Sequence, residues 1–160
     1  MINKKSSIII STFISLLFLL SACNPKEIYS EFHSLPDAIW NKNNPAVFEV
    51  EVQDSTLAYD LFINVRNNNN YSFQNLWLFI ESNDETGNIT KDTLNIELAD
   101  IYGKWHGKGF SIYSLSFPYK ESYRYPNCGK YTYKIEHGMR EETLLGVSDI
   151  GFVVSKGGNK

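Results

Sequence analysis

The chain has 160 residues, of which 42% are hydrophobic and 21% are charged, and its formal net charge is −3 at pH 7. This length suits one domain with a real core. Ten Tyr, ten Phe and three Trp make the composition too aromatic for a disordered stalk. Because phosphate binding requires a positive surface, the acidic balance excludes a nucleic-acid partner from the expected functions.

The first residues have the pattern of an export signal. Lys4 and Lys5 form a basic start, and an apolar run of 13 residues follows from Ile8 to Leu20. A membrane-spanning helix needs roughly 20 apolar residues. The run therefore predicts a cleavable signal peptide rather than a permanent membrane anchor.

The stretch Leu20-Ser21-Ala22-Cys23 closes this signal and resembles a bacterial lipobox. In such signals the cysteine sulfur, a nucleophile once ionised, takes a diacylglycerol, and cleavage before the cysteine frees an amine for further acylation. Two or three chains anchor stably, since each buried CH₂ contributes about 0.8 kcal/mol. We therefore predict lipid attachment at Cys23. The alternative is a disulfide between Cys23 and Cys128 in a freely secreted protein.

Cleavage before Cys23 divides the chain into three expected parts. Residues 1–22 are the signal peptide, residues 23–45 the lipidated N-terminus and a tether, and residues 46–160 a β-domain. The mature chain would have 138 residues, with 13 basic and 18 acidic side chains and a formal charge of −5. The tether is predicted from mixed charge, prolines and the lack of a lasting period, although Phe32, Ile39 and Trp40 are candidates for docking onto the fold.

Beyond the tether, apolar and polar side chains alternate with the period of half-buried strands. Turn signals separate the segments, and the charged outer faces argue against a sheet covered on both sides. We predict an all-β, antiparallel β-sandwich of about seven to eight strands. Only residues 137–145 suggest one or two helical turns. The strand segments are 48–54, 59–67, 75–82, 92–98, 110–119, 129–137 and 148–156.

Two of these segments depart from simple alternation. In residues 75–82, Trp77 and Phe79 point away from the other apolar side chains, so the strand is apolar on both faces and is predicted to be central. Residues 110–119 change face midway. Phe110 and Ile112 face inward first and Tyr113 takes over, which predicts a bulge.

Catalytic patterns are scarce. The three histidines lie far apart, and none has a Glu or Cys at metal-ligand spacing. Neither a nucleophile motif nor a phosphate-binding glycine loop is present in the sequence. Four carboxylates are candidates for a glycosidase-like pair, but solvated surface is the favoured interpretation. They are Asp92, Glu97, Asp100 and Asp149. We expect no enzyme activity, no metal and no cofactor.

The stretch ADIYGKWHGKGF, residues 99–110, is the most informative internal feature. Its glycines bend a loop that carries Trp105 and His106 between two lysines. Such a Trp is typical of a contact with a partner protein or a sugar, whereas the favoured interpretation is a Trp folded back over the end of the core. Arg66, at the end of its strand, is either a third candidate contact or a surface salt-bridge residue. Cys128 is expected to be an inert, partly buried thiol.

Two tripeptides, Asp54-Ser55-Thr56 and Asp92-Thr93-Leu94, look like the O-glycosylation sites of some envelope bacteria. Ser55 and Thr93 are the candidate acceptors. Matches this short are often accidental.

Four stretches, in order, resemble the gliding motility lipoprotein family GldH: YDLFINVRNNNNYSFQNLWLFI, DTLNIELADIYGKWHGKGF, GKYTYKIEHGMR and LLGVSDIGFVVSK. The resemblance implies an outer-membrane lipoprotein of the gliding machinery, linked to type IX protein secretion and acting through contacts with other envelope proteins. It implies no enzyme activity, and Cys23 is the one position carried over. The alternatives are a surface glycan-binding module using Trp105, Tyr102 and Tyr113, and a small glycosidase or peptidase.

Overall fold

The computed structural model describes residues 26–157, so Cys23 and the predicted signal peptide lie outside the described residues. Within this range almost every element is a strand, joined by one 3₁₀ turn, η1 (Pro36–Ala38). The strands are β1 (Glu27–Ser34), β2 (Ile39–Asn41), β3 (Ala46–Val52), β4 (Tyr59–Asn68), β5 (Asn75–Asp84), β6 (Ile89–Glu97), β7 (Lys108–Gly109), β8 (Ile112–Tyr123), β9 (Gly129–His137), β10 (Thr143–Leu145) and β11 (Val147–Lys156).

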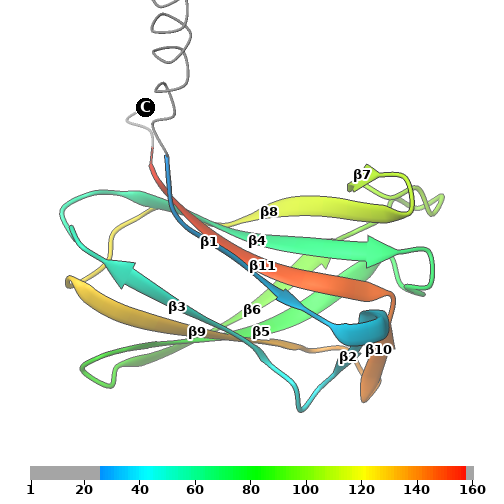
Figure 1. Ribbon diagram of the computed structural model, residues 1–160, viewed down its shortest axis with the longest axis horizontal. Helices are drawn as coiled ribbons and strands as arrows, with labels where there is room; N and C mark the ends of the chain where they lie inside the picture. The colour runs from blue at the N-terminus through cyan, green and yellow to red at the C-terminus, as the bar shows by residue number, and fades with distance from the viewer. Residues whose placement is uncertain (1–25, 158–160) are drawn as a thin grey trace, which may run out of the picture.

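The strands form two packed antiparallel sheets (Figure 1). One sheet has the order β1-β11-β4-β8-β7, the other has the order β3-β9-β5-β6, and β2 and β10 form a small ladder at one end. The predicted all-β sandwich is confirmed. The seven predicted strands are all present, as β3, β4, β5, β6, β8, β9 and β11, and the described chain adds four strands to them.

Aromatic side chains connect the two sheets at the centre of the core. The ring of Phe152, on β11, lies 5.7 Å from that of Phe48 on β3 and 4.4 Å from that of Tyr133 on β9. Tyr133 donates its hydroxyl to Tyr125 at 3.0 Å, which satisfies a polar group that is otherwise buried. Each large apolar side chain buried in this way contributes about 1.5–3 kcal/mol.

The predicted tether is wrong over most of its length, because the fold begins at Glu27 rather than after residue 45. Strand β1 pairs with β11, and the ring of Phe32 lies over Gly151, where a Cβ would come within 2.6 Å of it. Trp40 is fully buried in β2. The sequence of β1 does not alternate between apolar and polar residues, because β1 is an edge strand whose inward positions include the polar residues Glu31 and His33.

The short helix expected at residues 137–145 is also absent from the described structure. Leu144 pairs with Trp40 in the β10–β2 ladder, which seals one end of the sandwich. A ladder of three residues is too short to show a period in the sequence.

The bulge expected in the middle of the segment 110–119 lies elsewhere. Strand β8 begins at Ile112 and keeps one alternation from Tyr113 on, while its register against β4 shifts near Tyr59 and Leu61, at the opposite end. Phe110 precedes the strand and is 93% exposed. The apparent change of face therefore marks the turn from β7 into β8.

The segment from Leu98 to Ile112, here called the β7 loop, is fixed to the end of the core by Trp105. The indole ring of Trp105 lies 6.4 Å from the ring of Tyr71 and 5.9 Å from that of Tyr113. Its N–H donates to Asn69 Oδ1 at 2.9 Å. Trp105 thus packs back onto the core, which is the interpretation that the sequence favours.

Replacing Trp105 by Ala is expected to lower the free energy of unfolding by about 1–3 kcal/mol, less than for a fully buried Trp because the ring is partly exposed. Tyr102→Ala in the same loop, where the side chain is 88% exposed, should change it by less than about 0.5 kcal/mol. Urea denaturation of both variants measures the difference. Equal effects would contradict the structural role of Trp105.

His137 is buried at the sealed end of the core without a polar partner. Its ring lies 5.3 Å from that of Trp40, and neither ring nitrogen has a hydrogen-bond partner within the described protein atoms. Burial holds the pKa of His137 below its ordinary value of 6.5. The folded protein therefore favours the neutral ring, whereas the unfolded chain binds a proton near its ordinary pKa.

Because the unfolded state takes up the extra proton, the stability that His137 contributes is complete above the ordinary pKa and is lost as the pH falls below it. Thermal unfolding between about pH 7.5 and pH 5 should show this decline. His137→Phe should flatten it, and His106→Gln, at an exposed position, should leave it in place. A decline that persists unchanged in His137→Phe would show that another group causes it.

Candidate functional site

An aromatic pair stands on the outer face of the four-stranded sheet. Trp77 is 41% exposed and Phe79 is 49% exposed, although β5 lies between β9 and β6 as predicted for a central strand. A Cβ at Gly138 would lie 2.9 Å from Phe79, so the Phe79 ring rests on bare backbone. The central position of β5 is confirmed, but no described residue covers this outer face of the strand.

Two open hollows flank the aromatic pair along β5, with volumes of about 310 and 360 Å³. Phe79 lines the first and Trp77 the second. Met139 in the second hollow accepts the backbone N–H of Trp77 at its sulfur, at 3.4 Å. The aromatic pair and the two hollows are together called the β5 strip; its apolar part is the two rings with Phe73 and Met139. Around it lie Phe73, Asn75, Glu81, Lys91, Thr93, Lys134, Glu136, Arg140 and Glu141.

Four of the charged side chains beside the β5 strip form two ion pairs. Lys91 lies 3.0 Å from Glu81, and Lys134 lies 2.5 Å from Glu136. Exposed pairs of this kind contribute at most about 1 kcal/mol each. Their effect is to leave an apolar strip in locally neutral surroundings, which suits docking of an apolar side chain more than recognition of a charged ligand.

The β7 loop presents a second exposed apolar group. A tight turn at its start is built by Asp100, whose carboxylate accepts the backbone N–H groups of Tyr102 and Lys104, both at 2.9 Å. The hydrogen bond from Lys104 lowers the pKa of Asp100. Ile101 and Tyr102 on this turn are 77% and 88% exposed, and Phe110 across the loop is 93% exposed.

The residues proposed from the sequence as contacts lie around the base of this loop. The His106 side chain is 43% exposed, with Nε2 3.9 Å from Glu97 Oε1. Arg66 pairs in register with Ser114, as Lys108 of β7 does from the other side. The Arg66 guanidinium lies 4.1 Å from the ring centroid of Phe32. A role of Trp105, His106 or Arg66 in binding stays a prediction.

The four candidate carboxylates do not converge, because each has its own partner. Asp92 accepts the Tyr119 hydroxyl and lies 3.0 Å from Lys120 Nζ, so it links β6 to β8 across the open side of the sandwich. The Tyr119 hydrogen bond lowers the pKa of Asp92. Asp149 accepts the Ser34 hydroxyl at 2.7 Å. Among residues 26–157, no group of three His, Cys, Asp or Glu side chains is placed to hold a metal ion.

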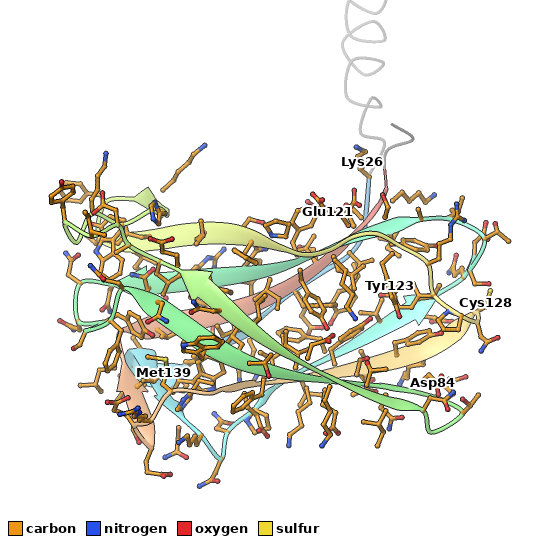
Figure 2. All side chains as sticks on the ribbon, turned by 180° about the vertical axis from the view of Figure 1, so that it is seen from behind. Lys26, Asp84, Glu121, Tyr123, Cys128 and Met139 are labelled. Carbon is orange, nitrogen blue, oxygen red and sulfur yellow. The ribbon has the colours of Figure 1, made fainter. Side chains whose placement is uncertain are left out.

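Cys128 is exposed, so the expectation of a partly buried thiol is wrong. It stands in the turn before β9, where its S–H donates to the Gln53 carbonyl at 3.4 Å and its sulfur accepts the Ser55 backbone N–H at 3.3 Å. Figure 2 shows it at the end of the sandwich near Asp84, away from Met139. Of the two candidate glycosylation acceptors, Thr93 is exposed on β6 and Ser55 is partly buried.

Neither the β5 strip nor the exposure of Phe110 is predicted from the sequence. A signal for the first was present, because β9 next to β5 alternates with charged residues at Lys134 and Glu136 on its outer face. An apolar residue on the same face of a neighbouring strand is then expected to be exposed. No comparable signal marked Phe110, which lies in a turn.

The comparisons with known proteins agree with one another. The model of the GldH lipoprotein family matches residues 27–154. A gliding motility lipoprotein GldH homolog of Christiangramia forsetii is 35% identical over 163 residues, which covers 97% of this chain and 99% of the relative. The gliding motility lipoprotein GldH of Flavobacterium johnsoniae is 36% identical over 146 residues, which covers 86% and 90%.

Solved structures give only weak likenesses. A structure of infectious bursal disease virus Gx strain reaches a TM-score of 0.29 at 12% identity, covering 83% of this chain and 33% of the other. The active domain of tailspike protein 4 of bacteriophage CBA120 reaches 0.28 at 13% identity, covering 81% and 17%. Neither bears on the fold or the function.

Within residues 26–157, no helix is long and apolar enough to cross a membrane. The resemblance seen in the sequence is confirmed by a family match over nearly all of the described domain and by relatives aligned over most of their length. The chain therefore belongs to the GldH lipoprotein family, and the relatives that it matches are gliding motility lipoproteins.

Proposed function

We propose that this protein is an outer-membrane lipoprotein of the gliding motility machinery, linked to type IX protein secretion, and that it acts without catalysis through contacts with other envelope proteins. The observation that carries the proposal is family membership in a chain whose signal ends at a lipobox cysteine. Acyl chains on Cys23 would confine the domain to the membrane plane. Confinement raises its effective concentration beside other envelope components.

The β5 strip is the docking surface of this proposal. It lies on the sheet that forms the lower layer in Figure 1, whereas Lys26, the first described residue, lies at the top (Figures 1 and 2). A domain attached near Lys26 thus presents the strip away from its attachment. Exposed Trp side chains are enriched among residues that dominate protein interfaces.

The packing beneath the strip supports the same assignment. Phe79 rests on the backbone of Gly138, and Gly138 donates its N–H to the Trp77 carbonyl at 2.7 Å. Both rings are therefore held in place before a partner arrives. Binding to side chains that are already ordered loses less conformational entropy. More of the free energy gained by burying the two rings then contributes to affinity.

Replacing Cys23 by Ala is expected to remove the protein from the membrane fraction and to abolish gliding, because no acyl chain then anchors the domain. In a strain lacking the gene, single-cell movement and secreted-protein output are measured after complementation with wild type or Cys23→Ala. Full restoration by Cys23→Ala would contradict the proposed anchor. A deletion strain that moves and secretes normally would contradict the role in motility and secretion.

The double variant Trp77→Ser, Phe79→Ser is expected to lose movement while keeping normal abundance in the membrane fraction. Both side chains are about half exposed, so their loss should cost only about 1 kcal/mol of stability each but should remove most of the apolar docking area. Leu57→Ser, at an exposed apolar position in the hollow beside Glu27 and Lys156, is the control. Normal movement of the double variant would exclude the β5 strip as the docking surface.

A further inference from the structure

The β7 loop carries the three most exposed large apolar side chains of the described residues, Ile101, Tyr102 and Phe110, here called the tip of the loop. Its three side chains are 77%, 88% and 93% exposed. Large apolar side chains that stay this exposed are candidates for contact with a partner or a membrane.

The loop beneath the tip is ordered by its own hydrogen bonds. Asp100 holds the turn that carries Ile101 and Tyr102, and the His106 N–H donates to the Leu98 carbonyl at 2.9 Å. Gly109 allows the second turn, since a Cβ there would lie 1.8 Å from the Ile112 carbonyl oxygen. The hydrogen-bonded turns therefore hold these apolar side chains in solvent, away from the core.

The chemistry of the tip matches that of a membrane interface. Aromatic rings such as those of Tyr102 and Phe110 partition to the boundary between headgroups and acyl chains. Lys104 and Lys108 flank the tip, and their ammonium groups can reach the headgroup level while their methylene stems stay in apolar surroundings. The one carboxylate of this turn, Asp100, is occupied by backbone N–H groups. Asp100 keeps its negative charge, so Lys104, Lys108 and Asp100 together leave the β7 loop with a formal charge of +1, which suits anionic lipids.

The tip and the attachment point lie at opposite ends of the same sheet. Strand β8 begins beside the loop at Ile112 and ends at Tyr123, which pairs with Tyr59, and Tyr59 pairs with Lys156 of β11. The Lys156 N–H donates to the Lys26 carbonyl at 2.8 Å. A strand of twelve residues spans about 40 Å, and this is the order of the separation along the sheet.

Both points face the same side of the molecule. In Figure 1 the start of β1 and the β7 loop are the highest parts of the coloured ribbon, and the five-stranded sheet lies between and below them. A flat surface laid across the top of this view meets both without crossing a strand. Only three peptide units join Cys23 to Lys26, a reach of at most about 11 Å, so an acylated Cys23 keeps this side close to the bilayer.

We propose that the tip of the β7 loop inserts into the interface of the membrane that holds the Cys23 lipid, as a second contact that lays the five-stranded sheet along the bilayer. This inference rests on the proposed lipid anchor. One flexible attachment leaves a domain free to pivot, whereas two contacts at opposite ends fix its orientation. The β5 strip on the other sheet then faces away from the membrane in a defined direction.

Spin labelling of the full, acylated chain tests the inference. The protein is reconstituted into vesicles of phosphatidylethanolamine and phosphatidylglycerol. Cys128 is replaced by Ser, and a nitroxide is attached through Tyr102→Cys at the tip or through Glu136→Cys on the outer face of β9. At each label the ratio of accessibility to dissolved oxygen over accessibility to a water-soluble nickel chelate is measured. This ratio should be several-fold higher at position 102 than at position 136. Ile101→Glu with Phe110→Glu should abolish this difference.

The outcomes separate this inference from the proposed function. If mass spectrometry shows acylated Cys23, the protein floats with the vesicles and both labels report water, the membrane contact of the tip is excluded and the anchor stands. The exposed tip is then left for a protein partner. A chain that is not acylated and does not float overturns the anchor and this inference together.

Discussion

The contact of the Phe152 ring with Phe48 and Tyr133 is the interaction on which the rest of the structure depends. It joins the strand next to the N-terminal edge strand to the opposite sheet, so both sheets keep a fixed relation through the middle of the core. One end is closed by Trp105 over Tyr71 together with the β2–β10 ladder over His137. The other end is filled by the rings of Tyr123, Tyr125 and Tyr131. Because the core and both ends are filled by other side chains, the exposed apolar side chains on β5 and in the β7 loop are not needed for folding.

That separation gives the two outer faces different roles. The outer face of the five-stranded sheet carries Phe32 under the guanidinium of Arg66 and lies on the side where β1 begins. The outer face of the four-stranded sheet carries Trp77 and Phe79, with two ion pairs beside them. In a sandwich of only two layers, whatever turns one outer face toward the membrane turns the other away from it. If the proposed attachment and docking surface both hold, the orientation of the β5 strip is set by the attachment of the opposite sheet.

The alternation of side chains was enough to predict seven strands and the sandwich, because those strands are half-buried and long. It failed for β1, whose inward positions at the sheet edge include Glu31 and His33, and for β10, which has only three residues. The same limit applies to the candidate surface. Apolar residues on both faces of β5 indicated its central place in the sheet, but only the neighbouring strand reveals that Trp77 and Phe79 are uncovered.

The β7 loop shows why residue type alone does not distinguish a structural from a functional aromatic. Trp105 is a candidate contact in the sequence because it is large and flanked by lysines. In the structure its N–H donates to Asn69 and its ring lies against Tyr71 and Tyr113. A large ring that can reach the core gains more by packing there than by staying in water. Phe110 is held out by the turn that Gly109 makes possible, so its ring has no such alternative. An apolar side chain that the backbone keeps exposed costs the isolated domain solubility, and a contact outside the domain is what offsets that cost.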